Sequence, residues 1–241
     1  MTAFLTIRLE DQLLFFSDGV GYDDEGVVQR IGPKVMLRPD LPAIIGSRGS
    51  SEFTDILPAF HGWVSFDDLV ERIPEDGAHV FSIMKEHRGP DDPPSAQVWL
   101  AGWSESAQRF ALKLIEFRAD GGEALPLTDV DRPCMYQPAP SEEACRKVGF
   151  RDGKPTIRSN QGLEAIVQDA VIFMHAQRLT KNVIHHLPDA PHGSMAGGFV
   201  QLSIITRSSL SSMIVHRYPD EIGKKIDPEA GVFGFEEVPL D

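Results

Sequence analysis

Two short apolar runs near the start of the chain have the length and spacing of strands. The first extends from Thr2 to Arg8 and the second from Gln12 to Ser17, and the polar pair Glu10 and Asp11 separates them. Apolar runs of this length, bounded by polar turn residues, are typical of buried strands. We therefore expect two neighbouring strands joined by a turn.

The following segments alternate between helical and strand-like patterns. Apolar residues three and four apart predict a helix from Ser50 and a second helix that Ser65 caps and Pro74 ends. A longer helix is predicted over 163–179, where the apolar stripe is broad. Shorter apolar runs predict the remaining strands, which are a pair within 27–37 interrupted by Gly32-Pro33, then 43–45, 78–84, 97–103, 109–117 and 199–206, with 212–216 as a strand or a helical turn.

The order of these elements predicts an α+β fold. Neighbouring strands are joined by short turns, as in antiparallel sheets, and the helices fall between groups of strands. A four-layer αββα sandwich of antiparallel sheets satisfies that order. The length of 241 residues fits a single domain, 1–241, with an irregular proline-rich insert over 118–160 in which only 142–148 has a helical pattern.

Composition narrows the classes of partner. Asp and Glu number 36 against 23 Lys and Arg, which gives a formal net charge of −13. Such a surplus of acid repels phosphates, so we expect no nucleic-acid partner. No stretch approaches the ~20 apolar residues that span a bilayer, and the chain start lacks a signal-peptide pattern, so we expect no membrane association. Cys134 and Cys145 form neither a zinc pattern nor a disulfide framework, which favours a cytoplasmic location.

The threonine at the second position is the first candidate for chemistry. A threonine hydroxyl is a weak nucleophile until a base removes its proton, and an α-amine at the chain start, with a pKa of ~7.7–8.0, is a suitable base near neutrality. Asp18-Gly19 lies 16 residues after Thr2, and Lys34 lies 32 residues after it. The small-residue loop Gly46-Ser47-Arg48-Gly49 then precedes the first predicted helix.

This order and spacing resembles the proteasome β-subunits and the related bacterial ATP-dependent proteasome-like peptidase, which are N-terminal nucleophile hydrolases. The match extends over about the first quarter of the chain, and Gln97–Gly102 and Gly197–Thr206 resemble later strands of the family. The resemblance implies a proteasome-like form of the αββα sandwich. It also implies assembly into a homo-oligomer and action on peptides or unfolded proteins.

The same resemblance implies a role for each matched residue. Thr2 is the implied nucleophile once Met1 has been removed. Lys34, as a nearby cation, disfavours protonation of the α-amine, and Asp18 orients and neutralises Lys34. The Gly49 amide is the implied donor to the oxyanion, a contact that contributes ~3–4 kcal/mol when it is preorganised.

Part of the family pattern is missing from the chain. The family has Asp-x-x-Ser-Gly before its late strand and a further serine in its middle section, whereas Gly193 and Ala196 occupy the aligned Asp and Ser positions here. Asp189, His192 and Ser194 are the replacements that the same loop offers.

Met1 adds a second constraint, because while it is attached Thr2 has only an amide nitrogen. Three functions therefore remain open. The leading hypothesis is a threonine peptidase or amide hydrolase that needs no cofactor. The alternatives are a catalytically inactive structural or binding subunit of the same fold, which the missing helper residues favour, and an amidase that acts on a small acylated molecule.

Four histidines lie close together in the sequence, and imidazole is a common metal ligand. They are His175, His185, His186 and His192. Their spacing fits no common metal motif, so we expect exposed histidines at a helix end and in a loop and assign no metal site.

Overall fold

The computed structural model describes residues 2–23, 25–49, 52–57, 62–88, 96–117, 127–158, 160–183 and 192–235. Its strands and helices, in chain order, are β1 (Phe4–Arg8), β2 (Leu13–Asp18), β3 (Val20–Tyr22), β4 (Val28–Ile31), β5 (Val35–Arg38), β6 (Ala43–Gly49), α1 (Glu52–Ile56), α2 (Phe66–Arg88), β7 (Ala96–Ser104), β8 (Arg109–Phe117), β9 (Thr128–Asp129), β10 (Cys134–Gln137), α3 (Glu142–Lys147), α4 (Leu163–Leu179), β11 (Asn182–Val183), β12 (His192–Gly193), β13 (Phe199–Ile205) and β14 (Leu210–Arg217).

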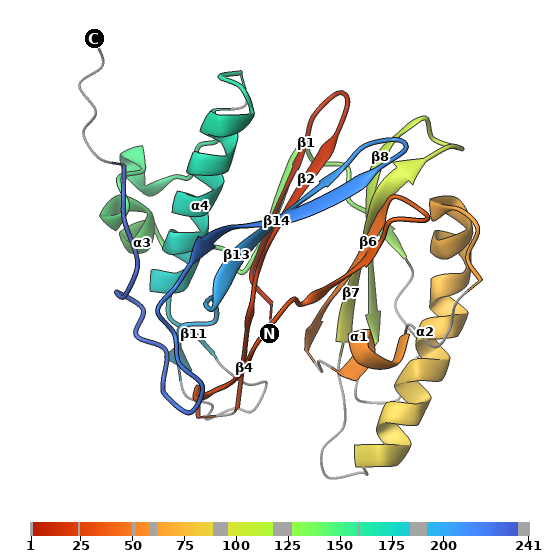
Figure 1. The fold of residues 1–241 in the computed structure, drawn as a ribbon, viewed down its shortest axis with the longest axis horizontal. Coiled ribbons are helices and arrows are strands. Elements are labelled where there is room, and N and C mark those ends of the chain that lie inside the picture. Colours follow the sequence, from red (N-terminus) through yellow and green to blue (C-terminus); the bar gives the residue numbers. More distant parts are fainter. Residues whose placement is uncertain are drawn as a thin grey trace.

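Two five-stranded antiparallel sheets form the centre of the fold (Figure 1). The strand order is β10-β1-β2-β13-β14 in the first sheet and β5-β6-β7-β8-β9 in the second, and β3-β4 and β11-β12 form two small separate pairs. The α+β class with antiparallel sheets, predicted from the sequence, is therefore confirmed. The central strand β2 is buried along its whole length.

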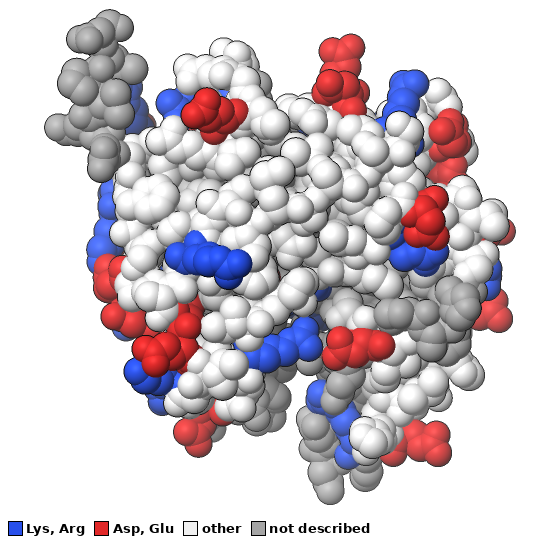
Figure 2. All heavy atoms as spheres, viewed as in Figure 1, with Lys and Arg blue, Asp and Glu red and all other residues white. Residues whose placement is uncertain are grey.

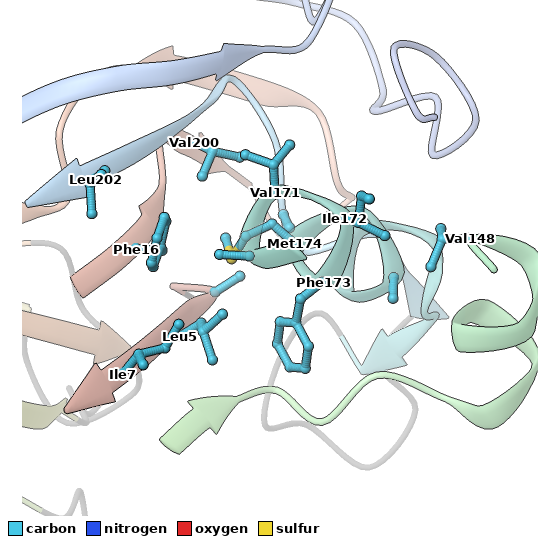
Figure 3. Packing of buried hydrophobic residues seen from close by; sticks show 14 of the residues in the cluster. Leu5, Ile7, Phe16, Val148, Val171, Ile172, Phe173, Met174, Val200 and Leu202 are labelled. Atoms are coloured by element: carbon cyan, nitrogen blue, oxygen red, sulfur yellow. The ribbon is translucent and has the colours of Figure 1, made fainter. Parts of the chain in front are cut away.

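Side chains alternate between the two faces of β2, and each face has its own hydrophobic partners. Leu14 and Phe16 belong to a cluster that contains the buried face of α4 (Figure 3). Leu13 and Phe15 belong to another cluster, which also holds side chains of the second sheet. Within that cluster the ring centroids of Phe4 and Trp99 are 4.7 Å apart.

A third cluster packs α1 and α2 against the opposite face of the second sheet. Figure 1 accordingly shows α3 and α4 outside one sheet and α1 and α2 outside the other. No helix in the described part of the chain combines the length and apolar character needed to cross a bilayer.

Helix α2 corrects two predictions made from the sequence. The helix continues through Pro74 to Arg88, and 78–84, predicted as a strand, is helical. The residues that α2 buries beyond the proline include Gly77, Val80 and Met84, which recur three and four positions apart. This helical spacing places them against the second sheet, and tertiary packing there outweighs the cost of a proline inside a helix.

The segment predicted as an irregular insert contains regular structure. α3 matches the helical pattern at 142–148, and the Ser141 hydroxyl caps it by accepting from the Ala144 amide. β10 pairs with β1 from Phe4↔Gln137 to Ile7↔Cys134. The sequence did not indicate this strand, because it is four residues long and lies between two prolines. Residues 118–126 lie outside the described residues.

Beyond β14 the chain crosses α4 and is fixed to it by buried polar contacts. The Arg178 guanidinium forms a bidentate pair with the Asp220 carboxylate at 2.9 and 2.7 Å, and both side chains are almost inaccessible to solvent. His175 Nδ1 lies 2.8 Å from the Phe233 carbonyl oxygen. The expectation that His175 is exposed is therefore wrong, whereas His192 is exposed and His185 and His186 lie outside the described residues.

Because His175 is buried as the neutral form, acid should weaken the fold. Burial lowers the pKa of His175 to about 4 from its usual 6.5, so below pH 6.5 the unfolded chain binds a proton that the folded chain excludes until pH 4. We expect about 2 kcal/mol of the free energy of unfolding to be lost between pH 7.5 and 4.5. Urea titrations of wild type, His175→Gln and the exposed-site control His87→Gln measure this loss. An equal loss in wild type and His175→Gln would contradict the assignment.

Candidate active site

The β1–β2 hairpin brings the start of the chain against the end of β2. The pairing of Phe4 with Ser17 places Ala3 beside Asp18. The Ala3 amide donates to Asp18 Oδ1 at 2.9 Å, and the Asp18 amide donates to the Ala3 carbonyl at 3.0 Å. The Asp18 carboxylate is therefore hydrogen-bonded to Ala3, the residue that follows Thr2.

Lys34, which directly precedes β5, completes a buried ion pair. Its Nζ donates to both carboxylate oxygens of Asp18, at 3.0 and 2.9 Å. The side chains of Lys34 and Asp18 are 9% and 0% exposed. Burial raises the pKa of Asp18 and lowers the pKa of Lys34, and the attraction between the two charges opposes both shifts.

Backbone amides supply the remaining hydrogen bonds to Asp18. The amides of Val20 and Gly197 each lie 3.3 Å from Oδ2. Gly197 belongs to the loop that also contains Ser194, one of the residues predicted to replace the missing helper residues. Ser194 in that loop is bonded to the Ala196 carbonyl, and Asp189 lies outside the described residues.

The Thr2 hydroxyl points toward β6. Oγ1 donates to the Ser47 carbonyl oxygen at 2.6 Å, and Thr2 is 7% exposed. Gly49 ends the same strand with a φ of 105°, a conformation that side-chain-bearing residues rarely adopt. The segment Gly46–Gly49, predicted as a loop from the sequence, is instead the last part of β6 and includes Ser47.

A pocket of about 170 Å³ joins these residues. Thr2, Lys34 and Gly49 all line it, while Asp18 lies behind Lys34 and is fully buried. The described residues around the pocket are Thr2, Gly21, Tyr22, Gln29, Arg30, Lys34, Ser47, Gly49 and Thr54. All four residues selected from the sequence therefore lie in or directly behind one pocket.

No local sequence pattern predicted the Arg178–Asp220 ion pair, which supports this site from the far side. Asp220 Oδ2 accepts from the Gly198 amide at 2.7 Å, and Arg178 donates to the Ala196 carbonyl at 3.0 Å. A Cβ atom on Gly197 would lie 2.5 Å from Asp220 Oδ2. Any larger residue at position 197 would have to displace this ion pair, because the Cβ would also lie 2.8 Å from Arg178 Nη1.

Comparison with known proteins finds structures of the same fold but no related sequence. Neither a protein-family model nor a curated protein matches the sequence. Solved structures do match. Anbu (ancestral beta-subunit) from Yersinia bercovieri has a TM-score of 0.54 and 13% identity, with 90% of this chain and 87% of that chain covered. The chain shares its fold with Anbu.

A second Anbu structure supports the same likeness. The Gly-1 mutant from Hyphomicrobium sp. strain MC1 has a TM-score of 0.51 and 12% identity, with 92% of this chain and 89% of that chain covered. The family chosen from the sequence was therefore wrong, because these structural matches are Anbu proteins instead of proteasome β-subunits or the ATP-dependent peptidase. At this identity the likeness concerns the fold.

No group of three or more His, Cys, Asp or Glu side chains in the described part of the chain has the geometry to hold a metal ion. The polar groups gathered around Thr2 are instead a hydroxyl, an ammonium, a carboxylate and backbone amides, which are suited to acid–base and nucleophilic chemistry.

We expect the contributions of Asp18 and Lys34 to the free energy of unfolding to depend on each other. Asp18→Asn and Lys34→Met should each cost about 3 kcal/mol, because each leaves one buried charge without its partner. The double variant should cost less than the sum of the two by at least ~1 kcal/mol. Denaturant unfolding of the four proteins measures the coupling. The exposed Glu142–Arg146 pair on α3 is the matched control and should show a coupling below about 0.5 kcal/mol. Additive costs for Asp18 and Lys34 would contradict the ion pair.

Proposed function

We propose that this chain is an amide hydrolase, acting on peptides, in which Thr2 is the nucleophile after Met1 has been removed. The observation that carries the proposal is the position of Asp18, which binds both the backbone beside Thr2 and the ammonium of Lys34. A buried carboxylate with these two partners fixes a cation in the pocket that the Thr2 hydroxyl lines.

In the proposed reaction the α-amine of Thr2 takes the proton from Oγ1, and Oγ1 attacks the carbonyl carbon of the substrate. The carbonyl π electrons move to its oxygen, and the Gly49 amide donates to that oxyanion. The resulting ammonium returns its proton to the leaving amine as the C–N bond breaks, which leaves an ester on Oγ1. Water, deprotonated by the same amine, then attacks the ester carbonyl carbon. The bond from that carbon to Oγ1 breaks, and the amine returns the proton to Oγ1.

Lys34 and Ser47 have supporting roles in this proposal. The cationic charge of Lys34 disfavours a second cation nearby and so favours the basic form of the α-amine. The Thr2 hydroxyl donates a hydrogen bond to the Ser47 carbonyl oxygen, with 2.6 Å between the two oxygens, which holds Oγ1 in the pocket until the amine takes its proton.

The fold expected from the sequence is part of the proposal. We infer one domain, 1–241, built as a four-layer αββα sandwich. The three hydrophobic clusters support this arrangement, because two lie between a sheet and helices and the third contains side chains of both sheets.

If Met1 is removed and Thr2 is reactive, the mass of the protein should change in two ways. A peptide epoxyketone closes a ring on both the hydroxyl and the free α-amine of an N-terminal threonine. We therefore expect purified wild-type protein to lack Met1 and to gain the mass of one inhibitor molecule. Intact-mass spectrometry before and after incubation measures both changes.

Two variants separate the nucleophile from other sites of labelling. Thr2→Ala should gain no inhibitor mass, whereas Thr2→Ser, which retains a hydroxyl, should react more slowly than wild type. Retained Met1 together with unlabelled Thr2 would overturn the hydrolase and leave the inactive structural subunit.

The proposed function includes assembly into a homo-oligomer in the cytoplasm that encloses the site and admits peptides or unfolded chains. β14 is the end strand of the first sheet, and an end strand has backbone groups available for pairing. Met213 and Ile214 on β14 are 52% and 41% exposed. β14 crosses the middle of the view in Figure 1, and Figure 2 shows few charged side chains there, with charges gathered toward the rim.

If β14 is buried between copies of the chain, Met213→Glu tests the proposed assembly. A charge at this position should reduce the assembled fraction, because a buried unpaired carboxylate is unfavourable. Sedimentation velocity measures the fraction, and Ile222→Glu, at a site that is 66% exposed, is the matched control. A wild-type chain that sediments as a monomer would contradict the assembly.

A further inference from the structure

The charged side chains among the described residues that line the pocket have one sign. Two of the nine described residues that line it are charged, and both, Arg30 and Lys34, are basic. The chain as a whole carries a formal charge of −13. The charged side chains of the lining are therefore opposite in sign to the chain average, and a basic group in a pocket attracts and orients an anionic group.

Arg30 supplies the positive charge that is available to a ligand. The charge of Lys34 is matched by Asp18, with which it forms the buried ion pair. Arg30 also has an acidic neighbour, since its Nη1 lies 3.6 Å from Asp55 Oδ2, but the two side chains are 45% and 59% exposed. An exposed pair at this distance is weak, so a carboxylate inside the pocket can compete with Asp55 for the guanidinium.

The β3–β4 pair fixes the position of Arg30. Gly21 is the cross-strand partner of Arg30, and a Cβ on Gly21 would lie 3.1 Å from Arg30 Cγ. The absence of that Cβ lets the aliphatic part of Arg30 lie close over β3. Gly21 and Arg30 together form one wall of the pocket.

Tyr22 adds a hydrogen-bond donor without a partner. Its hydroxyl is buried and has no hydrogen-bond partner within the described parts of the chain. Burial raises the pKa of Tyr22, Asp18 adds to the shift and Arg48 opposes it, so the phenol stays protonated at physiological pH. A buried donor without a partner is unfavourable, and a ligand that accepts its hydrogen bond relieves that cost.

We infer that the pocket selects substrates with a carboxylate side chain, Asp or Glu, on the residue whose carbonyl Thr2 attacks. This inference rests on the proposed function. Arg30 provides the charge, and the Tyr22 hydroxyl donates a charge-assisted hydrogen bond to the same carboxylate. A pocket of about 170 Å³ has room for such a side chain.

Three epoxyketone peptides that differ only in the residue next to the electrophile test the selection. Glu and Gln have nearly the same shape and differ in charge, and Leu represents an apolar side chain. We expect the second-order rate constant of labelling, followed by intact mass, to be at least tenfold higher for Glu than for Gln or Leu. Added salt should reduce the difference, because it screens charge.

Variants assign the preference to named side chains. Arg30→Gln should bring the Glu-to-Gln ratio close to one, and Tyr22→Phe should lower it several-fold. Arg146→Gln removes the same charge from an exposed site on α3 and should leave the ratio unchanged. Circular dichroism confirms that each variant is folded.

The outcomes distinguish this inference from the function on which it rests. Equal labelling by the Glu, Gln and Leu peptides would overturn acidic selection and leave the threonine hydrolase standing. Absence of labelling by all three would overturn the hydrolase itself, and the inferred substrate class with it.

Discussion

The arrangement of the site depends on the satisfaction of one buried carboxylate. Asp18 is inaccessible to solvent, and a charge in such a position is very unfavourable unless other groups compensate it. Compensation comes from the Lys34 ammonium and from amides of three separate segments, at Ala3, Val20 and Gly197. The chain start, the end of β2 and the loop before β13 are thereby held at one point, and the pocket lies beside that point.

The same carboxylate explains how the site is built without the family's Asp-x-x-Ser-Gly arrangement. The segment that carries it in that family is represented here by a glycine loop, whose backbone amide reaches Asp18 directly. The buried pair of Arg178 and Asp220 fixes this loop from behind. In this chain, backbone amides and two buried ion pairs thus surround the segment that carries Thr2.

The sequence predicted the parts that depend on local spacing. Thr2, Asp18, Lys34 and Gly49 were selected because their spacing resembles that of a family, and in the structure they lie in or directly behind one pocket. α4 was predicted with the boundaries that the structure has, since its apolar stripe is uninterrupted. The α+β class followed from the order of the elements.

Long-range contacts account for what the sequence did not indicate. Arg178 and Asp220 are 42 residues apart, and no local pattern links them. The burial of His175 depends on Phe233, which comes 58 residues later. α2 continues through Pro74 because its residues after the proline pack against the second sheet. A local stretch of sequence contains no information about that packing surface.

The glycine loop also has a consequence for biosynthesis. Its amide meets Asp18 across 179 residues of sequence, and the loop is held by Asp220, which is made later still. A nascent chain that has only emerged as far as β8 contains Thr2, Asp18 and Lys34 but lacks the Gly197 amide and the Arg178–Asp220 pair behind it. The polar surroundings of Thr2 are therefore complete only when nearly the whole polypeptide has left the ribosome.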